Sequence, residues 1–142
     1  MAYQWPVRVY IEDTDFGGLV YYANHLKFME RARTESLRAA GWSQAELIEA
    51  GIIFVVGRVN VRYLAPARLD QELCIETTIK EHRGARLLFA QAVNDRLSGQ
   101  QLSRGEVEVI CVEASRMRAC RWPTDLIDTM RAKVPELWTE QE

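Results

Sequence analysis

Residues that bind metals or form disulfides are scarce in this 142-residue chain. It has two histidines, too few for a metal centre of several imidazoles, and three cysteines without C-x-x-C spacing: Cys74, Cys111 and Cys120. We therefore expect free thiols, and neither a disulfide framework nor a metal site. The longest aliphatic and aromatic run, residues 52–56, is far too short to span a bilayer, so no integral membrane segment is expected.

Net charge is low as well. The chain has 18 basic and 20 acidic residues and a net charge of −2, so no overall field would recruit nucleic acid. The first residues lack a basic stretch followed by an apolar one, which predicts no secretory signal and a cytoplasmic location. Without repeats, linkers or low-complexity segments, the chain is expected to form a single domain over residues 1–142.

Alternation of apolar and polar residues predicts most of the elements. Val7, Val9 and Ile11 indicate a first strand, and apolar residues at helical spacing predict a long helix from Asn24 to about Ala40. A capping box starting at Ser43 predicts a short second helix that ends at Gly51, and Pro123 is expected to start a short C-terminal helix.

Four further strands follow the second helix. In the first of them, odd-numbered positions 53 to 63 are expected to share one face, opposite Arg58, Asn60 and Arg62. The others centre on residues 73–79, 87–93 and 107–111, with turns at 83–84 and 98–99. Gly57 and Gly105 lie inside strand patterns and are expected to be β-bulges that bend the sheet.

Consecutive strands with short turns imply an antiparallel sheet. Only one helix is long enough to cover it, and its narrow apolar stripe suits a position inside a concave sheet. The sequence therefore predicts an α+β hotdog fold, in which one long helix is wrapped by a curved five-stranded antiparallel sheet.

The common catalytic signatures are absent: G-x-S-x-G, the phosphate-binding P-loop and the dinucleotide-binding G-x-G-x-x-G. The remaining candidate is the acidic segment around Asp13 and Asp15, followed by Gly17, Gly18 and the start of the long helix. Two positions apart in an extended segment, the aspartates would point the same way. A carboxylate there could attack a carbonyl polarised by helix N–H groups, or it could simply cap the helix. Spacing alone leaves both interpretations open.

This segment resembles a known family. Residues 9–24, VYIEDTDFGGLVYYAN, are similar to the signature of the 4-hydroxybenzoyl-CoA thioesterase family, and residues 28–35, FMERARTE, resemble its Tol-Pal-associated branch. Looser similarity extends to residues 63–67, to the strand of Gln91 and to residues 111–113, so it covers nearly the whole chain.

The resemblance implies hydrolysis of an acyl-CoA thioester without metal or other cofactor, at sites on the interface of a homodimer. The family's catalytic carboxylate matches Asp15, which leaves Asp13 as a backbone or helix-cap partner. The backbone N–H that polarises the carbonyl falls on Tyr22, with Gly18 and Val20 shaping the turn beside it.

A histidine near the helix start and two glutamates on the long helix are further candidates for a catalytic role. Some members carry a catalytic histidine where this chain has Tyr22; His25 lies three residues on and does not inherit that role. Glu30 and Glu35 lie on the long helix, where ion pairing, as between Arg31 and Glu35, is favoured over catalysis.

Arginine side chains are well suited to the phosphates of CoA. Arg83 and Arg86 flank a predicted turn and Arg116 follows the last long strand, so these three are the candidate phosphate contacts.

The predicted function is hydrolysis of an acyl-CoA to free acid and CoA, by a homodimer or a homotetramer of paired dimers. The alternative is a non-catalytic module that binds acyl-CoA or acyl carrier protein. A hotdog dehydratase is disfavoured because neither histidine lies in a matching motif.

Overall fold

The computed structural model describes residues 2–138. The strands are β1 (Tyr3–Arg8), β2 (Ile52–Tyr63), β3 (Glu72–Arg83), β4 (Arg86–Asp95), β5 (Gln101–Glu113) and β6 (Arg118–Ala119). The helices are α1 (Tyr22–Ala39), α2 (Gln44–Glu49) and α3 (Thr124–Lys133), with 3₁₀ turns η1 (Ile11–Asp13) and η2 (Pro135–Leu137). The sheet is antiparallel throughout, in the order β1-β3-β4-β5-β2, and β6 pairs with β5. The hotdog architecture is confirmed, with the two-residue β6 added to the five predicted strands.

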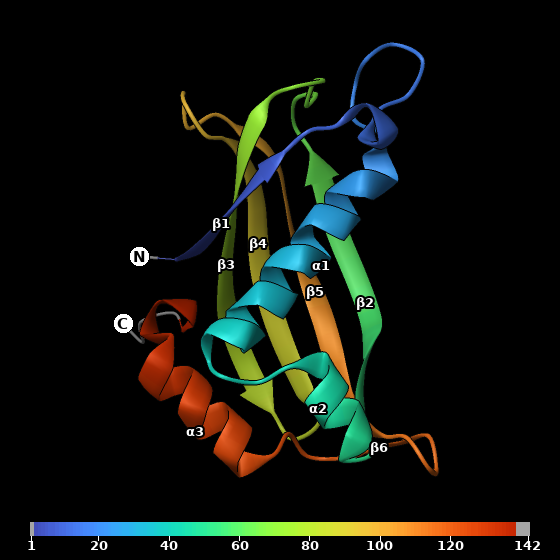
Figure 1. The fold of residues 1–142 in the computed structure, drawn as a ribbon, viewed down its shortest axis with the longest axis vertical. Coiled ribbons are helices and arrows are strands. Elements are labelled where there is room, and N and C mark those ends of the chain that lie inside the picture. The colour runs from blue at the N-terminus through green and yellow to red at the C-terminus, as the bar shows by residue number, and fades with distance from the viewer. Residues whose placement is uncertain (1, 139–142) are drawn as a thin grey trace.

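Helix α1 lies across the concave face of the curved sheet (Figure 1). Phe28, Met29 and Ala32 on its inner face are fully buried, in one cluster with Leu73 and Ile75 of β3. Burying a side chain of this size contributes about 1.5–3 kcal/mol, so this contact fixes the helix on the sheet. The start of α1 is thereby held at one end of the sheet, beside the end of β2 (Figure 1).

The predicted bounds need correction at the N-terminal end. The first strand spans Tyr3–Arg8 rather than extending to Ile11, because the chain turns into η1. Ile11 is therefore 77% exposed instead of buried. Helix α1 begins at Tyr22, two residues before Asn24, and Pro123 is the residue before α3 rather than its first residue. The capping box of Ser43 and Glu46 is confirmed.

The two strand glycines behave differently. A register shift between Val56 and Arg58 confirms the bulge at Gly57. Phe54 pairs with Cys111 before the bulge, and Val59 pairs with Val107 after it. The side chains facing α1 are thus even-numbered before the bulge and odd-numbered after it, so the single parity predicted from 53 to 63 is wrong.

Gly105 is not a bulge, because the β2–β5 register runs through it without interruption. A Cβ atom there would lie 2.4 Å from the carbonyl oxygen of Asn60. Glycine is needed at this position because two backbones approach closely.

Candidate active site

The acidic segment and the two glycines form a tight loop that leads into α1. Thr14 and Val20 form an isolated antiparallel bridge, and the Asp15 N–H donates to the Leu19 carbonyl over 2.8 Å. Gly18 turns the chain at the tip with φ +75°, and its N–H donates to the Asp15 carbonyl over 3.2 Å. The loop therefore returns on itself, and Asp15 lies opposite Leu19, three residues before the start of α1.

Contacts with residues 67–69 anchor this loop to the body of the protein. The N–H of Val20, which is buried, donates to the Ala67 carbonyl over 2.8 Å, and the Leu69 N–H donates to the Gly18 carbonyl over 3.1 Å. Gly18 and Val20 thus hold the turn in place.

We expect Gly18→Ala to lower the melting temperature by a few °C. A Cβ at Gly18 would meet nothing within 4 Å, so the cost comes only from the left-handed backbone, about 1–2 kcal/mol. Thermal unfolding measures it, with Gly17→Ala as the matched control, since Gly17 has no positive φ. Equal melting temperatures for the two variants would contradict this assignment.

The two aspartates have different environments, and the expectation that they point the same way is wrong. Asp13 lies in η1 and is 4% exposed. Its Oδ2 accepts the Tyr10 N–H over 2.9 Å and its Oδ1 accepts the Asn24 side-chain amide over 3.0 Å. Asp13 therefore connects the turn to the first residues of α1.

Asp15 is exposed. Its Oδ1 accepts the Gly17 N–H over 2.9 Å, which orients the carboxylate while leaving it open to solvent. One aspartate is thus committed to structure and the other is accessible to a ligand.

The first helical residue after this loop is Tyr22, preceded by Tyr21 as the N-cap. N–H groups of the first helical turn have no acceptor within the helix and carry partial positive charge. The Tyr63 hydroxyl of β2 donates to the Tyr22 carbonyl over 2.8 Å, which fixes this turn against the end of the strand. Burial, and then the neighbouring Tyr22, raise the pKa of Tyr63, so its phenol remains a donor. Sequence reasoning assigned no role to Tyr63 because only the fold brings it to the helix start.

His25 is a buried core residue. It is 3% exposed, and its Nδ1 lies 2.7 Å from the Ser103 hydroxyl. Its ring contacts that of Tyr63 edge to face, with centroids 5.0 Å apart. Burial lowers the pKa of His25, so the imidazole is neutral at pH 7.

The helix glutamates have local partners on α1. Glu35 pairs with Arg38 rather than with the predicted Arg31, and Glu30 accepts the Thr34 hydroxyl over 2.6 Å. A polar contact absent from the prediction joins Arg33 to Gln91 over 2.9 Å. Burial lowers the pKa of Arg33 to about 10, which still leaves it charged at pH 7.

The three predicted phosphate-binding arginines lie at the far end of the sheet from Asp15 (Figure 1). Arg83 ends β3 and pairs with Glu81, while Arg86 starts β4 and pairs with Glu108 over 3.0 Å. Arg116 is exposed in the turn between β5 and β6. The full length of the sheet, roughly 35–40 Å along β3, separates them from the acidic loop. The fold does not bring them into the Asp15 cluster within one subunit.

An oriented, accessible carboxylate in a loop that leads into a helix can attack an electrophilic carbonyl or activate water, provided that the substrate also reaches the helix N–H groups, which stabilise the resulting oxyanion. Among residues 2–138, no group of three or more His, Cys, Asp or Glu side chains is arranged to hold a metal ion. Over the same residues, no helix is both long and apolar enough to cross a membrane.

Comparison with known proteins places this arrangement in a family. Residues 9–130 match the model of the Thioesterase-like superfamily. The acyl-CoA thioester hydrolase YbgC of Escherichia coli O6:H1 is 44% identical over 125 residues, covering 88% of this chain and 92% of that protein. The acyl-CoA thioesterase YbgC of Haemophilus influenzae is 41% identical over 126 residues, covering 88% and 91%.

Solved structures agree on the fold. A probable thioesterase from Bartonella henselae superposes with a TM-score of 0.80 at 32% identity, covering 87% of this chain and 100% of that one. Slr0204, a 1,4-dihydroxy-2-naphthoyl-CoA thioesterase from Synechocystis, has a TM-score of 0.86 at 20% identity, covering 95% and 98%. The chain belongs to the Thioesterase-like superfamily, and the enzyme class expected from its sequence, a thioesterase, is confirmed.

Proposed function

We propose that this thioesterase hydrolyses an acyl-CoA to the free acid and CoA, with Asp15 as its catalytic carboxylate. The relatives named as acyl-CoA thioester hydrolases, which align with most of the chain, support the substrate class. The observation that carries the catalytic assignment is the contrast between the aspartates: Asp13 is buried with two hydrogen bonds, whereas Asp15 is exposed and is oriented by the Gly17 N–H in the loop before α1.

In the proposed reaction, the thioester carbonyl oxygen accepts a hydrogen bond from the Tyr22 N–H. As a nucleophile, Asp15 attacks the carbonyl carbon, the C–S bond breaks, CoA leaves as its thiolate, and water then hydrolyses the mixed anhydride. As a general base, Asp15 instead takes a proton from the water that attacks the carbonyl. His25 takes part in neither route, because it is enclosed in the core beside Ser103.

We also propose that the active enzyme is a homodimer, with further pairing to a homotetramer. Large apolar side chains around the acidic loop support an interface there: Tyr10 is 63%, Ile11 77% and Phe16 111% exposed. Such a cluster is unusual on a surface that faces only water. Contact of Arg83, Arg86 or Arg116 with CoA phosphates at Asp15 would require a second subunit, and it remains a prediction in that form. Location in the cytoplasm and a link to the Tol-Pal system also remain predictions.

Release of free CoA thiol from a panel of acyl-CoAs tests the function. Short aliphatic, aromatic and long-chain thioesters should be compared at equal concentration, because the fold leaves the acyl group open. We expect turnover of at least one class by the purified protein without added metal. Tight binding of acyl-CoA or acyl carrier protein with no turnover of any thioester would instead identify a non-catalytic binding module.

A further inference from the structure

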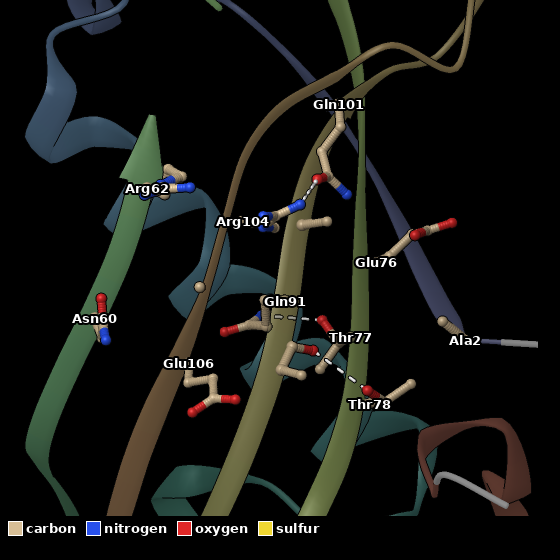
Figure 2. A pocket seen from close by; sticks show the side chains of 13 residues that line it. Ala2, Asn60, Arg62, Glu76, Thr77, Thr78, Gln91, Gln101, Arg104 and Glu106 are labelled. Carbon is tan, nitrogen blue, oxygen red and sulfur yellow. Dashed lines mark hydrogen bonds between the residues drawn. The ribbon is translucent and has the colours of Figure 1, made fainter. Parts of the chain in front are cut away.

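Two arginines lie directly opposite each other on the outer face of the sheet, the face turned away from α1. Arg62 of β2 and Arg104 of β5 are partners in the strand register, and both are exposed. Figure 2 shows Arg62 and Arg104 on neighbouring strands, with Arg104 turned toward Gln101 and α1 behind the sheet. Like charges opposed across two strands destabilise the sheet unless an anion lies between them.

Two other cations on this face already have carboxylate partners. Lys80 pairs with Glu106 over 2.7 Å and Arg86 pairs with Glu108 over 3.0 Å. Within the part of the chain that the structure describes, neither Arg62 nor Arg104 forms an ion pair. Arg104 donates only to the side-chain oxygen of Gln101, over 3.3 Å. The two guanidinium groups therefore keep donors for an external anion.

The arginines form one end of an open hollow of about 550 Å³, within the size range of ligand sites. Strand register defines its floor. One row across the sheet runs Glu76, Ala92, Arg104, Arg62, and the next runs Thr78, Ala90, Glu106, Asn60. Alanine in the middle of each row creates the depression, with basic side chains at one end and the Glu76 carboxylate at the other (Figure 2).

We propose that this hollow binds the nucleotide end of CoA, with Arg62 and Arg104 on its phosphates. Guanidinium forks match phosphate oxygens in a bidentate manner. The flat adenine would lie over the methyl groups of Ala90 and Ala92, with its amino group directed to Glu76. This assignment rests on the proposed acyl-CoA function and gives CoA a phosphate site in the same subunit as Asp15.

The position of the hollow fits the candidate active site. Arg62 is adjacent in sequence to Tyr63, whose hydroxyl holds the Tyr22 carbonyl at the start of α1. The basic end of the hollow thus lies at the same end of the sheet as the acidic loop. The pantetheine chain of a bound acyl-CoA would pass the point where β2 ends, at Tyr63.

Direct binding of CoA, measured by calorimetry, tests the proposal independently of turnover. Arg62→Gln and Arg104→Gln are each expected to raise the Kd for CoA about tenfold or more, and to leave the affinity for pantetheine unchanged. Arg118→Gln is the matched control, since it removes an exposed arginine of β6 at the far end of the sheet and should leave both affinities unchanged. Ala90→Phe, which fills the hollow but keeps both arginines, is expected to weaken CoA binding as well.

The melting temperatures of the variants show whether weaker CoA binding results from a lost contact or from a folding defect. Removing one of two opposed charges should leave the melting temperature of the free protein unchanged or raise it. Three results would overturn the proposal: CoA binding like wild type by both Arg62→Gln and Arg104→Gln, weaker CoA binding by Arg118→Gln alone, or binding of inorganic phosphate to wild type as tightly as CoA. CoA binding that depends on Arg62 and Arg104, without hydrolysis of any thioester, would sustain this site and defeat the proposed function instead.

Discussion

Replacing Asp15 by asparagine is expected to lower kcat at least about 100-fold, the usual contribution of a catalytic base or nucleophile. Asparagine keeps the size of the side chain and an oxygen that can accept the Gly17 N–H, so the loop should keep its shape. The amide can neither accept a proton from water nor form an anhydride. Steady-state release of CoA thiol from the best acyl-CoA of the panel measures the effect.

The melting temperature of Asp15→Asn serves as the control for this result. Because Asp15 is exposed, the variant should unfold within a degree or two of wild type. KM should change little, since the substitution removes a group needed in the transition state rather than a binding contact. A stable variant with near wild-type turnover would exclude Asp15 as the catalytic group.

Asp13→Ala is expected to have its main effect on stability. It leaves the partly buried Tyr10 N–H and the buried Asn24 amide without their acceptor, and each unsatisfied group costs about 1–3 kcal/mol. With the partly buried Tyr10 N–H at the lower end of that range, the sum is about 2–4 kcal/mol, which corresponds to a fall in melting temperature of about 10 °C for a chain of this size. Thermal or urea unfolding of the purified variant measures it.

Asp15→Ala is the matched control, because it removes a carboxylate two residues away in the same loop. It should cost less than about 1 kcal/mol, since its one hydrogen bond is exposed to water. Similar losses of stability in the two alanine variants would contradict the distinction between a structural and an accessible aspartate.

The sheet and the long helix could be predicted from sequence because burial on one face leaves a clear pattern. In β3 the predicted inward positions Leu73, Ile75 and Ile79 are all buried against the helix side. Turns at Gly84 and Gly99 could be predicted because both glycines adopt positive φ. In these segments the local sequence pattern and the burial in the folded protein favour the same structure.

Prediction failed where contacts distant in sequence decide the local conformation. Residues 9–13 read as a continuing strand, yet the chain forms a 3₁₀ turn because Asp13 is held by Tyr10 and Asn24. In β2, the face of each side chain before Gly57 depended on the bulge, which shifts the register by one residue. The alternation of apolar and polar residues along one strand does not reveal an extra residue that has no partner on the neighbouring strand, and such a residue reverses the faces of all positions beyond it.

The candidate site was predictable only in part. Family resemblance, not spacing, selected Asp15 over Asp13, and their different burial now supports that choice. The contact of Tyr63 with Tyr22 joins residues 41 positions apart. Arg62 and Arg104 likewise lie opposite each other because of the register between β2 and β5. That register cannot be predicted from the residues around either arginine.

The most direct test of the two-aspartate assignment is kcat per folded enzyme for Asp15→Asn and Asp13→Asn, measured together below the melting temperature of both. The predicted result is a loss of at least about 100-fold for Asp15→Asn and of less than about tenfold for Asp13→Asn, whose side-chain oxygen can still accept one of the two hydrogen bonds. The reverse order, with Asp13→Asn inactive and Asp15→Asn close to wild type, would contradict it.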